Sequence, residues 1–126
     1  WGYNASGELG TAVDAGSLVP VPVSGGLTFE TVSAGYQHTC GVTAEGTAYC
    51  WGFNYFGAVG DGSRTDRWSP VAVLGGLTFA TVSAGGLHTC GLTRDGGAYC
   101  WGANDEGQLG DGSRDDSDVP KRVLRP

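Results

Sequence analysis

Short segments of β-branched, aromatic and other apolar residues alternate with turns rich in glycine and polar residues along the whole chain. In the first copy of this pattern, four such segments fit strands, at residues 20–23, 28–34, 37–43 and 47–51. Apolar residues at helical spacing are not sustained over any long window. The pattern therefore predicts an all-β chain of short strands with almost no helix.

The pattern returns every 50 residues without insertion or deletion, because the dipeptide Trp-Gly recurs at positions 1, 51 and 101. Residues 1–50 and 51–100 are identical at 27 positions, mainly at the residue types that set backbone shape and core packing. A repeat of this size cannot bury its apolar face alone and needs neighbouring copies. We therefore expect one segment, residues 1–126, made of units 1–50 and 51–100 and the partial unit 101–126.

Four short antiparallel strands per unit match one blade of a β-propeller. The aromatic residues that recur in register are most simply the packing between adjacent blades. They are Trp1, Trp51, Trp101, Phe29, Phe79, Tyr49 and Tyr99. The chain holds about two and a half repeats, whereas propellers close with about 4–8 blades. We expect a longer chain to supply the remainder of the ring, with homo-oligomeric closure by strand exchange as the second option.

The formal net charge of the chain is −6, and the basic residues do not form a stripe. Phosphate backbones are bound through clustered Lys and Arg, so nucleic acid is not an expected partner. The basic residues near the end of the chain, Lys121, Arg122 and Arg125, fit a solvated strand edge. No apolar run is long enough for a membrane span, and none is expected.

The four cysteines form two pairs at equivalent places in the repeat. The pairs are Cys40 with Cys50 and Cys90 with Cys100. A three-residue loop at 44–46, with Gly46 in the left-handed conformation, would place the two cysteines of the first pair directly opposite each other. A loop at 94–96 does the same for the second pair. Opposed residues lie about 4.5–5.5 Å apart at Cα, which a disulfide can span. We therefore predict two disulfides and an oxidising compartment, which is extracellular, periplasmic or at the cell surface.

Two other states of the cysteines stay open. A zinc site is disfavoured because nine residues separate the cysteines of each pair, whereas zinc ribbons and fingers space them closely. Reduced cysteines that act as small buried apolar residues are the more serious alternative.

Residues with catalytic or metal-binding chemistry are few. His38 and His88 recur at one place in the repeat, which suggests a structural hydrogen bond to neighbouring backbone, and the adjacent Thr39 and Thr89 lack an orienting carboxylate. Residues 57–62 superficially resemble a phosphate-binding loop without its Lys. Four aspartates of the third copy could gather around calcium, although their spacing does not fit the common calcium loop. These are Asp111, Asp115, Asp116 and Asp118. We predict no catalytic residue, metal or cofactor.

Two longer motifs suggest a family. Residues 100–112 read Cys-Trp-Gly-Ala-Asn-Asp-Glu-Gly-Gln-Leu-Gly-Asp-Gly, and residues 82–90 read Val-Ser-Ala-Gly-Gly-Leu-His-Thr-Cys. Over essentially the whole chain, the sequence resembles the repeats of the regulator of chromosome condensation family. This resemblance implies a β-propeller, seven-bladed in the well-known members. The cysteine pairs are similar to the bacterial, exported branch, and the basic tail of chromatin-binding members is missing, so guanine-nucleotide exchange is not carried over.

The copies differ mainly in loops 11–19, 61–69 and 111–118, and at Tyr55 and Phe56. Aromatic residues beside arginine on a rigid loop are typical of protein interfaces, although they can equally pack against a neighbouring blade. The candidate binding residues are Tyr55, Phe56, Arg64, Asp66, Arg67, Trp68, Arg114 and Asp116.

Taken together, these features predict a non-enzymatic, exported module that binds a protein partner through variable loops. A carbohydrate-binding propeller is the first alternative, because Trp, Asn and Asp on loops also suit sugars. Inhibition of a secreted enzyme is a special case of protein binding. An intrinsic enzyme would need a buried cluster of titratable groups.

Overall fold

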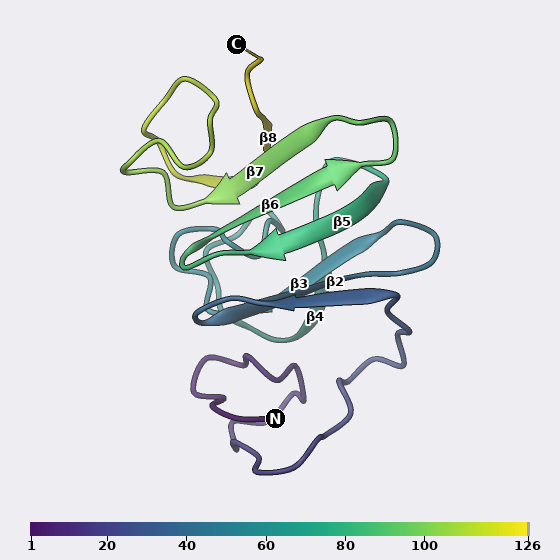
Figure 1. Cartoon of the computed structure of the whole chain (residues 1–126). Helices are drawn as coiled ribbons and strands as arrows, with labels where there is room; N and C mark the ends of the chain where they lie inside the picture. The colour runs from purple at the N-terminus through teal and green to yellow at the C-terminus, as the bar shows by residue number, and fades with distance from the viewer. Residues whose placement is uncertain (126) are drawn as a thin grey trace.

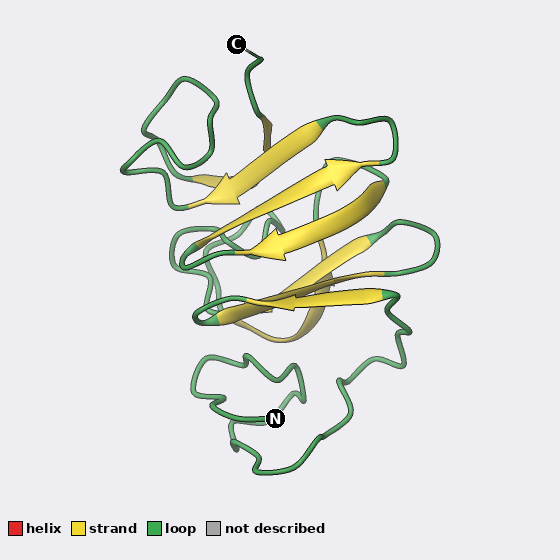
Figure 2. Ribbon diagram, viewed as in Figure 1, coloured by secondary structure: helices red, strands yellow, loops and turns green. Residues whose placement is uncertain are grey.

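The computed structural model describes residues 1–125 as two antiparallel sheets of four strands each, without a helix in that range (Figures 1 and 2). The first sheet contains β1 (Thr31–Ala34), β2 (His38–Val42), β3 (Ala48–Gly52) and β4 (Arg67–Ala72). The second contains β5 (Phe79–Ala84), β6 (His88–Thr93), β7 (Ala98–Gly102) and β8 (Ser117–Arg122). Strands follow one another in sequence order within each sheet. The all-β prediction and the blade of four antiparallel strands are therefore confirmed.

The β2–β3 hairpin has the loop that the sequence predicts. The backbone N of Thr43 donates to the carbonyl of Thr47 at 3.1 Å, and Gly46 has a φ of 88°. This turn sets the register, so that Cys40 lies opposite Cys50. A disulfide joins the two, with their Cα atoms 4.1 Å apart.

The β6–β7 hairpin repeats this geometry. Gly96 has a φ of 87°, and Cys90 and Cys100 are opposed and joined by a disulfide. The two disulfide-bonded pairs are compatible with an oxidising compartment.

The strand expected at residues 20–23 is not formed, and this part of the sequence prediction is wrong. The equivalent segments of the later copies are β4 and β8, which pair with β3 and β7 respectively. The fourth strand of a sheet thus comes from beyond the next Trp-Gly, and each sheet crosses the boundary between repeat units. In the first copy, Trp1 and Gly2 correspond to the last two residues of β3. Gly2 forms an isolated bridge with Ser17.

The apolar core lies between the two sheets, where β5 packs against β1 and β2 (Figure 1). The buried residues of this cluster are Cys40, Val42, Ala48, Cys50, Val59, Phe79 and Trp101. Turns near β1 and β5 add backbone contacts, since the N of Tyr36 donates to the carbonyl of Gly85 at 3.1 Å. Side chains of both sheets therefore form one core, as stacked repeats require.

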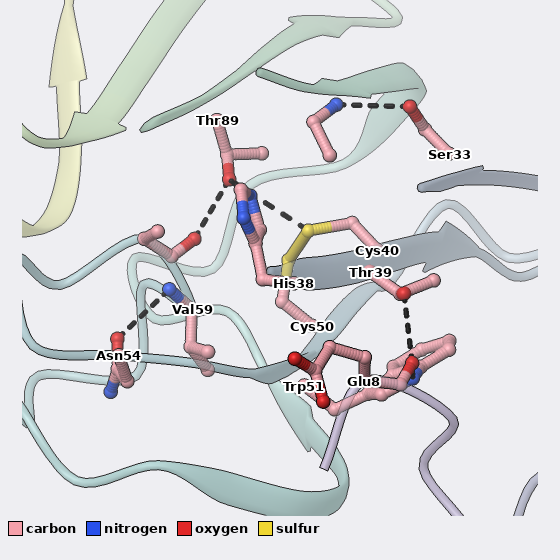
Figure 3. The surroundings of a disulfide bond; sticks show 12 residues. Glu8, Ser33, His38, Thr39, Cys40, Cys50, Trp51, Asn54, Val59 and Thr89 are labelled. Carbon is pink, nitrogen blue, oxygen red and sulfur yellow. Dashed lines mark hydrogen bonds between the residues drawn. A yellow bond between two sulfur atoms is a disulfide. The ribbon is translucent and has the colours of Figure 1, made fainter. Parts of the chain in front are cut away.

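A buried polar contact also joins the sheets (Figure 3). The hydroxyl of Thr89 donates to the carbonyl of Ala58 at 2.8 Å and lies 2.8 Å from Nε2 of His38. Because the single hydroxyl proton is used toward Ala58, His38 is the donor in the second bond. The expected bond of this histidine to neighbouring backbone is therefore wrong, and its partner is a side chain of the next sheet. Burial, with a smaller contribution from His88, lowers the pKa of His38 to about 4.

The loop before the first sheet is hydrogen-bonded to the tryptophan of that sheet, whereas the buried Nε1 of Trp101 in the second sheet has no hydrogen-bond partner among the residues that the structure describes. The carbonyl of Glu8 accepts hydrogen bonds from Nε1 of Trp51 and from the hydroxyl of Thr39, both at 2.9 Å (Figure 3). The ring of Trp51 also lies at 5.5 Å from that of Phe29, between centroids. In the second sheet, the ring centroids of Phe79 and Trp101 lie 5.8 Å apart. Phe79 and Trp101 belong to the core between the sheets, in agreement with the packing role that the sequence suggests. Trp1, for which the sequence suggests the same role, is 75% exposed, so the prediction is wrong for this residue.

Glycine in the middle of β6 makes room for an aromatic ring. A Cβ atom on Gly91 would lie 2.6 Å from the ring of Phe79, which is 1% exposed and cannot move away easily. Gly41 stands in the same relation to Phe29. The glycine therefore allows the ring to cover the strand directly.

We predict that Gly91→Ala lowers the free energy of unfolding by about 1–3 kcal/mol, because the added methyl overpacks a closed site. Gly86→Ala is the matched control, since nothing lies within 4 Å of its Cβ position, and it should change stability by less than about 0.5 kcal/mol. Urea unfolding followed by tryptophan fluorescence measures both. Equal effects of the two substitutions would contradict the packing of Phe79 on Gly91.

We also predict that His38 makes the fold sensitive to mild acid. The pKa of this histidine falls from 6.5 in the unfolded chain to about 4 in the folded one. The unfolded state therefore binds the proton first as the pH drops through this window, and the free energy of unfolding decreases by up to about 1.4 kcal/mol per pH unit. Above the window the contribution is constant. His38→Gln should flatten this slope in urea titrations, whereas His88→Gln should keep most of it, because burial is the larger cause of the lowered pKa of His38.

Candidate functional site

Two equivalent loops carry most of the predicted site. The β3–β4 loop, residues 53–66, and the β7–β8 loop, residues 103–116, extend from the same side of the two sheets (Figure 1). The hairpin loops lie at the other ends of these strands. Comparison of the two loops separates residues that shape the backbone from residues that are free to differ.

A buried asparagine holds the β3–β4 loop. The side-chain amide of Asn54 donates to the carbonyls of Ser63 and Thr65, both at 3.0 Å, and its oxygen accepts from the N of Val59 at 3.0 Å. Asn104 makes the same set of bonds fifty residues later, and Asn4 makes a similar set in the first copy. The loops are therefore rigid supports for their exposed side chains.

Two of the candidate binding residues complete this support. The carboxylate of Asp66 accepts from the backbone N of Asn54 at 2.8 Å, and that of Asp116 accepts from the N of Asn104 at 2.7 Å. The first copy has Gly16 at this position. These carboxylates therefore cap the loops, a role that the sequence analysis did not identify.

Arg67 is directed into the β3–β4 loop. Its Nε lies 2.6 Å from a carboxylate oxygen of Asp61, and its guanidinium also donates to the hydroxyl of Ser63. Partial burial would raise the pKa of Asp61, but hydrogen bonds from Ser63 and Arg67 outweigh it and hold this pKa below its usual value. Arg67 thus neutralises a carboxylate within its own loop.

Three aromatic side chains form a cluster at the start of the β3–β4 loop. The ring of Tyr55 stacks on that of Phe53 at 6.4 Å and meets the edge of Phe56 at 5.0 Å, between centroids. Tyr55 is 67% exposed, and the two phenylalanines are half-buried beside it. Sequence comparison alone missed Phe53, although its equivalent Tyr3 in the first copy is also aromatic and Ala103 in the third is not.

Arg64 connects this cluster to the next sheet. Its Nη1 donates to the carbonyl of Tyr55 at 3.4 Å and lies 3.9 Å from the carboxylate of Asp116. Its Nε lies 3.6 Å from the carboxylate of Asp118. These side chains are substantially exposed, so the pairs contribute little to stability, but they place Arg64 between the two loops. The sequence analysis considered Asp118 only as a possible calcium ligand, and not as a partner of Arg64.

The remaining candidates lie apart from the cluster. Trp68 is half-buried in β4, where its carbonyl accepts from the N of Ala12 at 2.8 Å and Gly7 fits closely against its Cα atom. It therefore packs against the preceding loop. Arg114 is exposed and donates to the carbonyl of Asp105 at 3.2 Å. The structure thus brings together Tyr55, Phe56, Arg64 and Asp116.

Within residues 1–125, no group of three or more His, Cys, Asp and Glu side chains is arranged to hold a metal ion. The carboxylate of Asp111 instead accepts from the N and the hydroxyl of Ser113.

No helix in the described part of the chain could cross a membrane.

A hollow of about 350 Å³ opens at the hairpin end of the second sheet. It is lined by Gly76, Leu77, Thr78, Thr93, Arg94, Asp95 and Tyr99.

Solved structures of other proteins share this architecture. One match is to a crystal structure of Kap60 bound to yeast RCC1 (Prp20). It covers 99% of this chain and 32% of the matched chain, with 23% sequence identity and a TM-score of 0.82. The match to Prp20p from Saccharomyces cerevisiae covers 90% of this chain and 29% of Prp20p, with 23% sequence identity and a TM-score of 0.72. The match to human WBSCR16 covers 82% of this chain and 27% of WBSCR16, with 24% sequence identity and a TM-score of 0.70. The chain spans about a third of the length of these proteins.

The model of the regulator of chromosome condensation (RCC1) repeat matches residues 1–42, 45–92 and 95–126. A second model of the same repeat matches residues 29–58 and 79–108. The matches cover the Trp-Gly turns, the buried asparagines and both cysteine hairpins. The chain therefore belongs to the regulator of chromosome condensation (RCC1) repeat family.

Proposed function

We propose that this chain is a non-enzymatic interaction module that binds a partner protein through the β3–β4 loop. The observation that carries this proposal is the exposed ring of Tyr55, supported by Phe53 and Phe56 and flanked by Arg64. Aromatic residues and arginine are the residue types that dominate the binding energy of protein interfaces. Their presence on one copy of an otherwise repeated loop favours recognition over a scaffold role.

The rigidity of the loop strengthens this argument. Asn54 and Asp66 fix the backbone on both sides of the aromatic cluster. A preorganised loop loses little conformational entropy when a partner binds, so more of the contact energy appears as affinity. A flexible loop with the same side chains would bind more weakly.

Relatives of similar architecture bind proteins. Yeast RCC1 (Prp20) has been crystallised with Kap60, and the structure of Prp20p was described together with its binding properties to Gsp1p and histones. These relatives support protein recognition as the general use of the fold. Their particular partners, and guanine-nucleotide exchange, do not form part of the proposal for this chain.

The proposal includes the compartment and the assembly. Two disulfides in a chain of 126 residues support export to an oxidising environment. A net charge of −6 favours a protein over a nucleic acid as the partner. Further blades of a longer chain would complete the ring, with association of several copies as the second option.

A photo-crosslinking experiment tests the proposed function. Tyr55 is replaced by p-benzoyl-phenylalanine, and the chain is irradiated with the extracellular and cell-surface proteins of the organism that makes it. Tyr36, which is 79% exposed on another turn, is replaced in the matched control. We expect a discrete protein adduct at position 55 and none at position 36. With that protein in hand, Phe56→Ala should weaken binding by about 2 kcal/mol or more.

Two outcomes would contradict this function. Equal adducts at both positions would show that Tyr55 is merely exposed. Sugar binding on a glycan array that Tyr55→Ala abolishes would favour the carbohydrate-binding alternative, because aromatic rings also stack on sugar faces.

A further inference from the structure

We propose that the surface formed by the aromatic cluster and the adjoining acidic segment, residues 103–118, binds an extended, arginine-bearing segment of the partner. This inference rests on the proposed function and specifies the chemistry of the partner. Its evidence is the distribution of charge, the availability of particular carboxylates and the junction between the two loops.

Negative charge is concentrated in one part of the chain. The acidic segment contains six carboxylates and one arginine, which gives a net charge of −5, whereas the whole chain has −6. The β3–β4 loop and the first residue of β4 hold two aspartates and two arginines and are neutral. A strongly acidic surface therefore adjoins an aromatic, uncharged one.

Three carboxylates of the acidic segment are available to a ligand. Asp105, Glu106 and Asp115 are exposed, and none of them takes part in an ion pair within the described residues. One oxygen of Asp105 accepts a hydrogen bond from the side-chain amide of Gln108 at 3.0 Å, and its other oxygen remains open to a ligand. The other three have structural roles, because Asp111 and Asp116 hold the loop and Asp118 pairs with Arg64. Three of the six carboxylates thus hold the backbone or pair with Arg64, whereas among residues 1–125 the three exposed ones form no ion pair and only Asp105 has a side-chain partner, Gln108.

The aromatic and acidic parts adjoin each other at Arg64. Arg64 contacts the carbonyl of Tyr55 and the carboxylate of Asp116, and Asp116 in turn accepts from the N of Asn104, which precedes Asp105. These contacts connect Tyr55 to Asp105 through one arginine and one loop cap. A short segment in extended conformation can therefore reach both parts.

Arginine fits this surface better than lysine. A guanidinium group is planar, so it can stack on an exposed ring such as that of Tyr55 while its N–H groups point toward neighbouring carboxylates. Arg64 itself illustrates the second contact, since its guanidinium lies between the Tyr55 carbonyl and the carboxylates of Asp116 and Asp118. A lysine ammonium would gain the charge attraction but little of the stacking.

Fluorescence anisotropy with a labelled Gly-Arg repeat peptide tests this inference on the full chain. The first variant, Asp105→Asn/Glu106→Gln/Asp115→Asn, removes the three exposed carboxylates. Its control, Asp14→Asn/Glu30→Gln/Glu45→Gln, removes three exposed carboxylates of the first copy and changes the net charge equally. We expect the first variant to weaken binding about tenfold, and the control less than about twofold, because charge attraction is local at physiological salt.

The aromatic contribution is measured separately. Tyr55→Ala should weaken binding of the Gly-Arg peptide about threefold and leave a Gly-Lys peptide nearly unchanged, whereas Tyr36→Ala should affect neither. Urea midpoints equal to that of the parent chain show that each variant is folded.

Several results would overturn the inference. They are absence of Gly-Arg binding, equal losses in the two charge variants, or equal affinity for the arginine and lysine peptides. If the charge-neutralised variant still crosslinks the same protein from position 55, this inference fails while the proposed function stands.

Discussion

The structure depends on the burial of one sheet by the next. The buried face of β2 and β3, with its disulfide, is covered by Phe79 of the second sheet, and the hydroxyl of Thr89 satisfies the imidazole of His38 at the same interface. Neither sheet could exclude water from this face alone, because a single layer of four short strands has no second layer of its own. The constraint explains why the conserved positions of the two copies are glycines, aromatics, cysteines and the His-Thr pair. Phe79, the cysteines and the His-Thr pair form this interface, whereas Gly41 and Gly91 let a ring approach the strand.

The same constraint leaves the loops free in their side chains but not in their backbone. Asn54 and Asn104 make matching sets of hydrogen bonds, although the exposed residues that follow them are Tyr55 and Phe56 in one loop and Asp105 and Glu106 in the other. Backbone geometry is therefore constant while surface chemistry changes. A scaffold of this kind can present an aromatic and an acidic loop side by side, and it does so through Arg64.

Features determined by local spacing could be predicted from the sequence, and features determined by distant pairing could not. The three-residue turn at Gly46 fixed the register of β2 and β3, so the disulfide between Cys40 and Cys50 followed from residue counting. The fourth strand of each sheet was misplaced because it follows the Trp-Gly dipeptide that ends β3 or β7, and so belongs by sequence to the next repeat unit. The capping role of Asp66 and the contact of Arg64 with Asp118 involve separations of twelve and 54 residues, for which the repeat pattern carries no signal.

The distribution of charge gives the acidic segment a meaning that composition alone does not. A net charge spread evenly over the surface would promote solubility and little else. Here Asp111 and Asp116 are used to hold the loop, so their charge is a consequence of the backbone they support. The carboxylate of Glu106 makes no such contact within the described residues, and Asp105 accepts only from the exposed side-chain amide of Gln108. Their equivalents Tyr55 and Phe56 show that the fold accepts uncharged residues at these positions. The backbone of the loop therefore does not require carboxylates at these two positions, and the cationic ligand that we propose beside the aromatic cluster would account for their presence.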